Sequence, residues 1–358
     1  MKRKIALVCA AAMALSLAAC GNTASTTSES TASESTASES SATAEAAGEE
    51  AAASDFDNTQ SITVITREEG SGTRGAFIEL TGVEEKNDAG EKVDNTSAGA
   101  ATQNSTNGVM TTVANDETAI GYISLGSLND TVKAVTVGGV AASAETVKDG
   151  TYTLARPFNI VTNGDATDPV AVDFINYCMS TDGQALATED GYIGSDDAAA
   201  FESTQPSGSI TVGGSSSVSP LMEKLIEAYE GVNPNASIEL LTTDSTVGVS
   251  GALDGTYTIG MASRELKDSE VEAGAKATVL AMDGIAVVVN PANPIEDLTI
   301  DQIKSIYTGE TTTWDAIQQS RQQKRMAVAA HQAAAILLVK KRTPLTDPKG
   351  PPPNRIGV

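Results

Sequence analysis

The sequence has few of the residues on which hydrolases and protein metal sites usually depend. Among 358 residues there is one histidine, His331, and only one of the three cysteines, Cys178, lies beyond residue 20. A single cysteine can form neither an internal disulfide nor a cysteine-rich metal site. A Ser-His-Asp or Cys-His catalytic group would depend on His331, which lies in a tail of unusual composition. We therefore expect no catalysis, no cofactor and no bound metal.

Basic and aromatic residues are also scarce. The chain has 23 Lys and Arg against 47 Asp and Glu, a net charge of −24, and 4% of its residues are aromatic. This charge argues against nucleic acid as a partner, because phosphate backbones need a basic surface. A small anion site remains compatible with it, since N–H dipoles act locally and distant surface charge is screened. The length suits two domains, and 40% hydrophobic residues suffice for a core.

The first 60 residues predict a leader and a spacer. Lys2–Lys4 precede an apolar run, Ile5–Ala19, that is too short for a comfortable transmembrane helix. Leu17–Gly21 resembles a bacterial lipobox, which implies cleavage before Cys20, lipidation of that cysteine and anchoring outside the cell membrane. An ordinary secretory signal is the alternative. Residues 21–60 are rich in Ser, Thr, Ala and Glu and indicate a disordered spacer.

The stretch Thr66–Phe77 has the pattern of an anion site. It follows an alternating strand, Ile62–Ile65, and runs through a Gly-Ser-Gly-Thr turn into a helix. The first N–H groups of a helix have no partner within the helix, and its dipole favours negative charge there. Arg67 adds a positive charge, and Ser71 and Thr73 add hydroxyl donors. These features predict that an oxyanion binds at this turn.

The same strand, hydroxyl-rich turn and helix occur three more times in the second half of the chain. Strands that alternate with helices predict an α/β fold with a mainly parallel sheet. Ligands of such sheets bind beyond the carboxyl ends of the strands, so the four turns are expected to converge. The three later turns are Gly213–Ser217, Asp244–Gly248 and Ser263–Leu266.

Five motifs of the chain form a recognisable set. They are Thr66–Arg74, Gly214–Val218, Ala262–Lys267, Met282–Asn290 and Ile306–Trp314. Together they resemble the phosphate-binding proteins of phosphate ABC transporters, over about residues 61–317. The resemblance implies a two-lobe α/β fold of periplasmic-binding-protein type II, with the ligand cleft between the lobes. It implies a monomeric extracytoplasmic protein that binds inorganic phosphate and delivers it to permease subunits, without cofactor or catalysis.

Three other functions stay open at this stage. The same fold could bind sulfate, molybdate or tungstate, or it could belong to a surface or sensory protein derived from the binder. A hydrolase with Ser71 or Ser217 as nucleophile would need a base that the folded part of the sequence does not provide.

The order of the motifs is reversed relative to the family, which resembles a circular permutation. A fragment of a tandem duplication is the alternative. In the permuted arrangement, residues 61–137 and 290–317 form lobe B, and residues 138–289 form lobe A. Residues 195–208 join the original ends of the chain. The basic, proline-rich residues 318–358 are not expected to belong to the fold.

Carried over residue by residue, the resemblance implies a set of phosphate contacts on both lobes. Hydroxyl and N–H groups come from the four turns, the charge comes from Arg67, and Glu69 orients that arginine or accepts the proton of the ligand. The implied contacts are Arg67, Glu69, Ser71, Gly72, Thr73, Ser216, Ser217, Ser245, Thr246 and Ser263.

One position departs from the family, because Arg264 stands where some members have an aspartate that accepts the ligand's proton. If Arg264 enters the site, Glu69 is the candidate acceptor. If it points outward, Ser263 alone contacts the ligand from this turn. Three more residues are interpreted as structural: Asp283 as a turn or hinge contact, and Trp314 and Cys178 as packing residues. Tyr122 fits either the cleft or the core.

Overall fold

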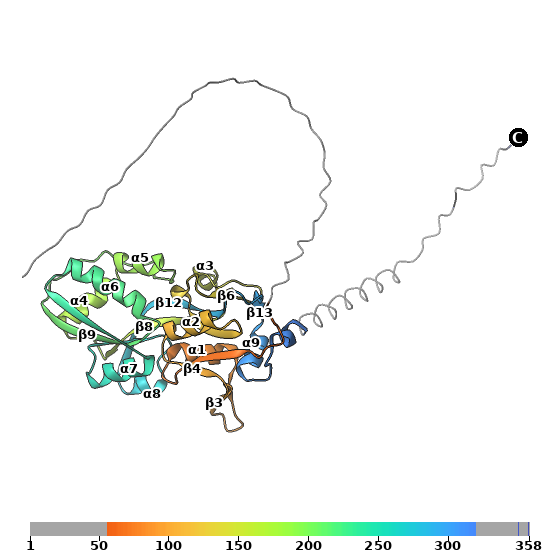
Figure 1. The fold of residues 1–358 in the computed structure, drawn as a ribbon. Helices are drawn as coiled ribbons and strands as arrows, with labels where there is room; N and C mark the ends of the chain where they lie inside the picture. The colour runs from red at the N-terminus through yellow and green to blue at the C-terminus, as the bar shows by residue number, and fades with distance from the viewer. Residues whose placement is uncertain (1–55, 320–349, 351–356, 358) are drawn as a thin grey trace, which may run out of the picture. The chain divides into compact units, whose positions relative to one another are not determined.

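The computed structural model describes residues 56–319 together with Gly350 and Gly357 (Figure 1). The predicted lipidation at Cys20, the leader, most of the spacer and most of the tail lie outside the described residues. Within the described part of the chain, no helix is long and apolar enough to cross a membrane.

One nine-stranded sheet contains most of the strands, in the order β10-β9-β11-β8-β12-β5-β1-β4, with β6 pairing with β12. Two small sheets pair β13 with β7 and β2 with β3. The strands are β1 Thr63–Arg67, β2 Glu84–Lys86, β3 Lys92–Asp94, β4 Ala101–Gln103, β5 Ala119–Ser124, β6 Lys133–Ala134, β7 Thr136–Val137, β8 Ala155–Asn163, β9 Gly208–Ser215, β10 Ala236–Thr243, β11 Ile259–Ala262, β12 Ala275–Val289 and β13 Asp297–Leu298.

Helices follow most of the strands along the chain, as the α/β pattern predicts (Figure 1). They are α1 Gly72–Thr81, α2 Thr106–Asn115, α3 Ala144–Lys148, α4 Pro169–Cys178, α5 Thr181–Glu189, α6 Ser219–Val232, α7 Ser245–Asp254, α8 Asp268–Glu272 and α9 Ile300–Tyr307, with a 3-10 turn, η1, at Leu125–Ser127.

The large sheet is mixed, whereas the sequence predicts a mainly parallel one. Strands β9, β10 and β11 pair in parallel at one end, as do β1, β4 and β5 at the other. The central pairs β11–β8, β8–β12 and β12–β5 are antiparallel. The reason is that β8 and β12 link the two parallel sets, and they run against each other and against the strands beside them.

Strand β12 connects the two halves of the fold. Its residues Ala275–Gly284 pair with β8, and Ile285–Val289 pair with β5. One core cluster lies around Phe158 and Phe174, and another contains Phe77, Tyr122 and Trp314. We call the half around the first cluster lobe A and the half around the second lobe B.

The core packing divides the chain at different places from those that the sequence predicts. Val147, Tyr152 and Leu154 belong to the lobe B core, together with Ile285 and Val287. The lobes therefore meet near the start of β8 and near the middle of β12, rather than at residues 138 and 289. The apolar residues before β8 cause the difference, because they pack on the second half of β12.

The two ends of the described fold lie side by side. The N–H of Ile62 donates to the carbonyl of Thr312 at 2.8 Å, and the N–H of Asp315 donates to the carbonyl of Asn58 at 2.8 Å. Trp314 is fully buried, and its Nε1 donates to the carbonyl of Thr118 at 3.1 Å, so it is a packing residue as predicted. Adjacent ends are what a permuted chain requires.

The predicted join at residues 195–208 is held to lobe A by a buried carboxylate. Asp173, on α4, accepts hydrogen bonds from Ser203 Oγ at 2.6 Å and from Thr204 N and Oγ1 at 2.9 and 3.0 Å. The hydroxyl of Tyr229 donates to the same carboxylate at 3.0 Å. Burial alone would raise the pKa of Asp173, but these hydrogen bonds together lower it. The join is therefore a packed part of the lobe.

We predict that Asp173→Ala destabilises the protein by about 2–3 kcal/mol, because it removes a charged acceptor and leaves buried donors without a partner. Urea unfolding measures this loss. A carboxylate whose pKa is lowered by folding stabilises the folded state at pH values above its unfolded pKa of about 4. This contribution is lost as the pH falls through the lower pKa of the folded state. The wild type should therefore lose more stability on acidification than the variant does.

Asp165→Asn is the matched control, since Asp165 pairs with Lys276 through side chains that are 85% and 59% exposed. Surface ion pairs contribute little, so urea unfolding of this variant should resemble that of the wild type. Equal stability of Asp173→Ala and Asp165→Asn would contradict the anchoring role.

Candidate anion-binding site

Five buried hydroxyl groups from both lobes meet at one point. Thr73 Oγ1 lies 2.8 Å from Ser217 Oγ, and Thr106 Oγ1 lies 3.2 Å from the same oxygen. Ser263 Oγ lies 3.5 Å from Thr73 Oγ1 and 3.3 Å from Ser245 Oγ. We call these residues the hydroxyl cluster. Each is at most 3% exposed, so the groups are directed at one another and not at bulk solvent.

Four helix N-termini deliver most of the hydroxyl cluster. Thr106 and Ser245 are the first residues of α2 and α7, Thr73 is the second residue of α1, and Ser217 lies two residues before α6. Ser263 directly follows β11. The positive ends of helix dipoles therefore surround the cluster and favour an anion there. The predicted convergence of hydroxyl-rich turns is what the structure shows.

Arg67 ends β1 and reaches the cluster from lobe B. It is 2% exposed, and its Nη2 donates to Ser216 Oγ at 3.0 Å. Its Nε and Nη2 donate to the two carboxylate oxygens of Glu68 at 2.8 and 2.7 Å. Behind it, the hydroxyl of Tyr122 accepts from the N–H of Arg67 at 3.1 Å, and the Tyr122 ring stacks on Phe77 in the core. A bidentate carboxylate holds the guanidinium in one orientation.

The acidic partner of Arg67 is Glu68 and not Glu69, which is a correction to the sequence-based prediction. Glu69 is exposed, whereas Glu68 is half-buried against the guanidinium. The turn after β1 decides between the two neighbours, because it directs their side chains differently. A Glu-Glu pair in sequence carries no signal of that choice.

Arg156, at the start of β8, is a second buried arginine beside the hydroxyl cluster. It is 2% exposed, its Nη1 donates to Asp283 Oδ2 at 2.6 Å, and its Nη2 donates to Thr73 Oγ1 at 2.9 Å. Burial raises the pKa of Asp283, and the neighbouring guanidinium opposes that rise. Asp283 thus makes a contact where the lobes meet, as predicted.

Sequence reasoning missed both Arg156 and Thr106. An arginine just before Pro157 and Phe158 in the strand Ala155–Asn163 was the available signal, because a buried charge needs a specific partner. Thr106 is the first residue of α2, and Ser105 is the N-cap of that helix. The segment from β4 to α2 therefore has the same order of strand, hydroxyl residues and helix as the predicted turns.

Three predicted site residues shape the backbone around the site. A Cβ atom on Gly72 would lie 2.4 Å from Ser245 Oγ and 2.8 Å from Ser263 Oγ, so only glycine permits this approach of the lobes. Thr246 donates from its N–H and its hydroxyl to the carbonyl of Gly70, at 3.1 and 3.2 Å. Ser71 caps α1, where its hydroxyl accepts from the N–H of the third helical residue at 3.3 Å.

Arg264 turns away from the hydroxyl cluster toward α8. Its Nη1 and Nη2 donate to the carboxylate of Glu270 at 2.8 and 2.7 Å, and Nη2 lies 3.4 Å from Thr246 Oγ1. The second of the two sequence-based alternatives therefore holds, and Ser263 is the residue of this turn that joins the cluster. Arg264 has no acceptor to offer in any position, and the exposed Glu69 is not placed to accept a proton from a ligand in the cluster.

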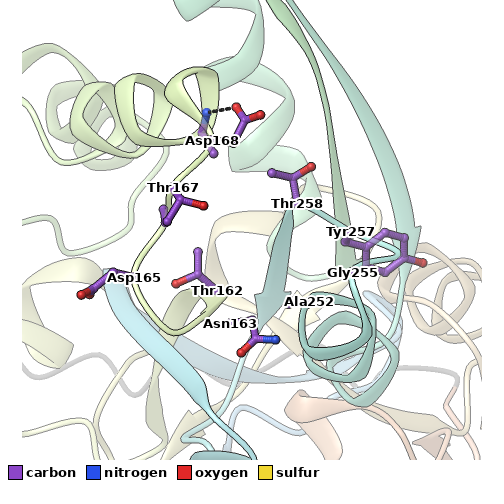
Figure 2. A pocket seen from close by; sticks show the side chains of 11 residues that line it. Thr162, Asn163, Asp165, Thr167, Asp168, Ala252, Gly255, Tyr257 and Thr258 are labelled. Carbon is purple, nitrogen blue, oxygen red and sulfur yellow. Dashed lines mark hydrogen bonds between the residues drawn. The ribbon is translucent and has the colours of Figure 1, made fainter.

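The surface pocket drawn in Figure 2 lies apart from the hydroxyl cluster. It has a volume of about 310 Å³ and lies beyond the end of β8 and beside α7. Thr162, Asp168 and Tyr257 line it, and Asp168 caps α4 through backbone N–H groups. Its lining contains none of the hydroxyl cluster. Among the described residues, no group of three His, Cys, Asp or Glu side chains is arranged to hold a metal ion.

Comparison with known proteins places this arrangement in a family. The sequence matches the family described as PBP superfamily domain over residues 29–182 and 199–340. The phosphate-binding protein PstS 2 of Streptococcus agalactiae serotype V is 51% identical over 254 residues, which cover 71% of this chain and 87% of that protein. The PstS 2 protein of Streptococcus pneumoniae serotype 4 is 44% identical over 268 residues, 74% of this chain and 90% of its own.

A solved structure agrees with the sequence comparison. The crystal structure of a phosphate ABC transporter phosphate-binding protein from Streptococcus pneumoniae TIGR4 matches with a TM-score of 0.59 at 43% identity, over 72% of this chain and 99% of that chain. The chain therefore belongs to the PBP superfamily and, within it, to the family of PstS phosphate-binding proteins.

Proposed function

We propose that this protein is an extracytoplasmic, monomeric lipoprotein that binds inorganic phosphate between its lobes and delivers it to the permease subunits of an ABC transporter. The observation that carries the proposal is the buried hydroxyl cluster, with four helix N-termini and a carboxylate-paired arginine directed at it. The relatives are named as phosphate-binding proteins, which supports phosphate as the anion. Lipidation of Cys20 would keep the protein at the outer face of the membrane.

The proposed contacts use neutral donors from both lobes and one fixed charge. Lobe B would supply Arg67, the Thr73 hydroxyl and the N–H groups at the start of α1. Lobe A would supply Ser216, Ser217, Ser245 and Ser263. A guanidinium held in one plane suits two oxygens of a tetrahedral anion. Because the contacts come from both lobes, an anion bound here would favour their closure about β8 and β12.

The partners of the serines support binding rather than catalysis. Ser217 Oγ lies beside the hydroxyls of Thr73 and Thr106, and Ser71 caps a helix. A serine nucleophile needs an adjacent general base, and these hydroxyls are not bases. We therefore propose that the bound anion leaves unchanged.

An oxyanion other than phosphate is the alternative ligand, because the carboxylates beside the site have other partners. Two carboxylates beside the site, Glu68 and Asp283, are each engaged by an arginine, and Asp244, which precedes Ser245, caps α7. Discrimination of protonated phosphate from sulfate would then depend on hydroxyl oxygens, which can accept as well as donate. Sulfate, molybdate or tungstate binding by the same cluster is the alternative.

Calorimetric titration of the purified protein with phosphate and with sulfate tests the proposal. We expect heat with phosphate and a raised thermal midpoint, with about 2.7 kcal/mol of stabilisation at a phosphate concentration one hundred times the Kd. Weaker binding of sulfate is expected. If phosphate gives neither heat nor stabilisation, the proposed function is wrong; tighter binding of sulfate would establish the alternative.

Arg67→Gln should weaken phosphate binding by about tenfold to a hundredfold, because it removes a charge-assisted donor. Glu68→Gln should weaken binding less, since the guanidinium remains but loses its bidentate partner. Glu69→Gln is the matched control and should bind phosphate as the wild type does, because Glu69 is exposed. Calorimetry of the three variants decides. A loss in Glu69→Gln as large as that in Glu68→Gln would restore the sequence-based role of Glu69.

Gly72→Ala should abolish tight phosphate binding, because the added methyl would collide with Ser245 and Ser263 when the lobes close. Gly75→Ala, three residues along the same helix, has only the Cδ of Arg264 at 3.9 Å and should leave binding intact. It should also stabilise the helix by roughly 0.5–1 kcal/mol. Phosphate titration and urea unfolding of both variants check this; equal affinities would show that the approach at Gly72 is not required.

A further inference from the structure

We propose that Arg156 is a second cationic group of the anion site, which acts on the bound anion through the hydroxyl of Thr73. This inference rests on the proposed function and adds a positioning residue to it. Arg156 belongs to none of the five motifs that carry the family resemblance. It lies at the start of β8, where the lobes meet, and it is 2% exposed.

The guanidinium of Arg156 is fixed from three sides. Its Nη1 donates to Asp283 Oδ2 at 2.6 Å and to the carbonyl of Gly284 at 3.4 Å, and its Cζ lies 5.2 Å from the ring centroid of Phe158. Arg156 and Asp283 face each other directly in the β8–β12 register. Its Nη2 points at Thr73 and lies 2.9 Å from the Thr73 Oγ1.

That hydrogen bond determines what Thr73 can do. A hydroxyl has one hydrogen and two lone pairs. Because Arg156 donates to Thr73 Oγ1, one lone pair is occupied and the hydroxyl hydrogen is directed elsewhere, toward Ser217 or an anion in the cluster. Donation from a charged group also polarises the hydroxyl and strengthens it as a donor. Arg156 thus prepares Thr73 to donate to an oxyanion.

The same arrangement is found on the other side of the cluster. Arg67 is paired with Glu68 and donates to the hydroxyl of Ser216. Arg156 is paired with Asp283 and donates to the hydroxyl of Thr73. In each case a carboxylate orients a buried guanidinium, and the guanidinium orients a hydroxyl. Arg156 contacts the cluster at Thr73, and Arg67 contacts Ser216, the neighbour of Ser217 in the chain. Two guanidinium groups oriented in this way beside one cluster are expected of a ligand site.

The electrostatics of Arg156 is consistent with an anion nearby. Burial lowers the pKa of Arg156, Asp283 opposes this, and the positive charge of Arg67 lowers the pKa further. An anion in the cluster would lie beside a guanidinium whose charge burial disfavours, and its negative charge would favour the protonated form.

A double-mutant cycle with inorganic phosphate tests the inference. Arg156→Gln and Thr73→Val should each weaken phosphate binding by about tenfold to a hundredfold. The phosphate affinity of the double variant should lie within about twofold of that of the single variant that binds more weakly, because both changes remove the same donor. Calorimetry gives the affinities, and thermal unfolding without phosphate reports the fold.

Tyr152→Phe is the control for a merely structural effect at the hinge. The Tyr152 hydroxyl is buried and donates to the carbonyl of Ile285 at 2.8 Å, two residues beyond Asp283. Its loss should lower the thermal midpoint and leave phosphate affinity unchanged. If Arg156→Gln fails to fold, Arg156→Lys replaces it: lysine keeps the charge beside Asp283 but lacks the planar fork, so phosphate affinity should still fall.

The outcomes separate this inference from the proposed function. Wild-type protein that does not bind phosphate overturns the proposed function itself. Wild-type protein that binds phosphate, together with a folded Arg156 variant of equal affinity, overturns this inference alone. Strictly additive losses in the double variant also overturn it, since they would mean that Arg156 does not act through Thr73.

Discussion

The contact between the hydroxyls of Thr73 and Ser217 is the interaction on which the rest of the site depends. Thr73 lies at the start of α1 in lobe B, and Ser217 lies just before α6 in lobe A, so a distance of 2.8 Å between their oxygens defines the meeting of the two lobes. Such an approach brings several helix N-termini together, which is unfavourable without a negative charge between them. Under the proposed function, an anion bound between these termini would therefore favour lobe closure.

Buried charge sets the second constraint. Arginines 67 and 156 are both almost fully buried, and a buried guanidinium without a partner would cost several kcal/mol. Glu68 and Asp283 supply the partners, so the site is close to neutral despite its two cations. The acidic surface of the protein can therefore coexist with a site for anions, because the local donors and not the net charge determine what binds there.

The sequence was informative where function depends on local backbone geometry. A strand followed by glycine, hydroxyl residues and a helix places N–H groups at a predictable end of a sheet, so Ser217, Ser245 and Thr73 could be found without a structure. The orientation of long side chains could not be predicted from the sequence. Whether Glu68 or Glu69 meets Arg67, and whether Arg264 faces the cluster or Glu270, depends on turns and on contacts between distant segments. For the same reason, the proposed role of Arg156 could not be predicted, because it depends on the pairing of β8 with β12 that places Arg156 opposite Asp283.

The proposed permutation of the motifs would have little consequence for such a site. Every group in the hydroxyl cluster is delivered by the end of a strand or the start of a helix, and those positions depend on the sheet and not on where the chain is cut. The ends of the described fold pair with each other through Ile62 and Thr312, and the join at residues 195–208 is bound to Asp173. Under the proposal of a permuted chain, both the new ends and the old ones are thus held by specific hydrogen bonds. A site built from converging termini of secondary structure can survive such a rearrangement, because each contributing segment remains local and complete.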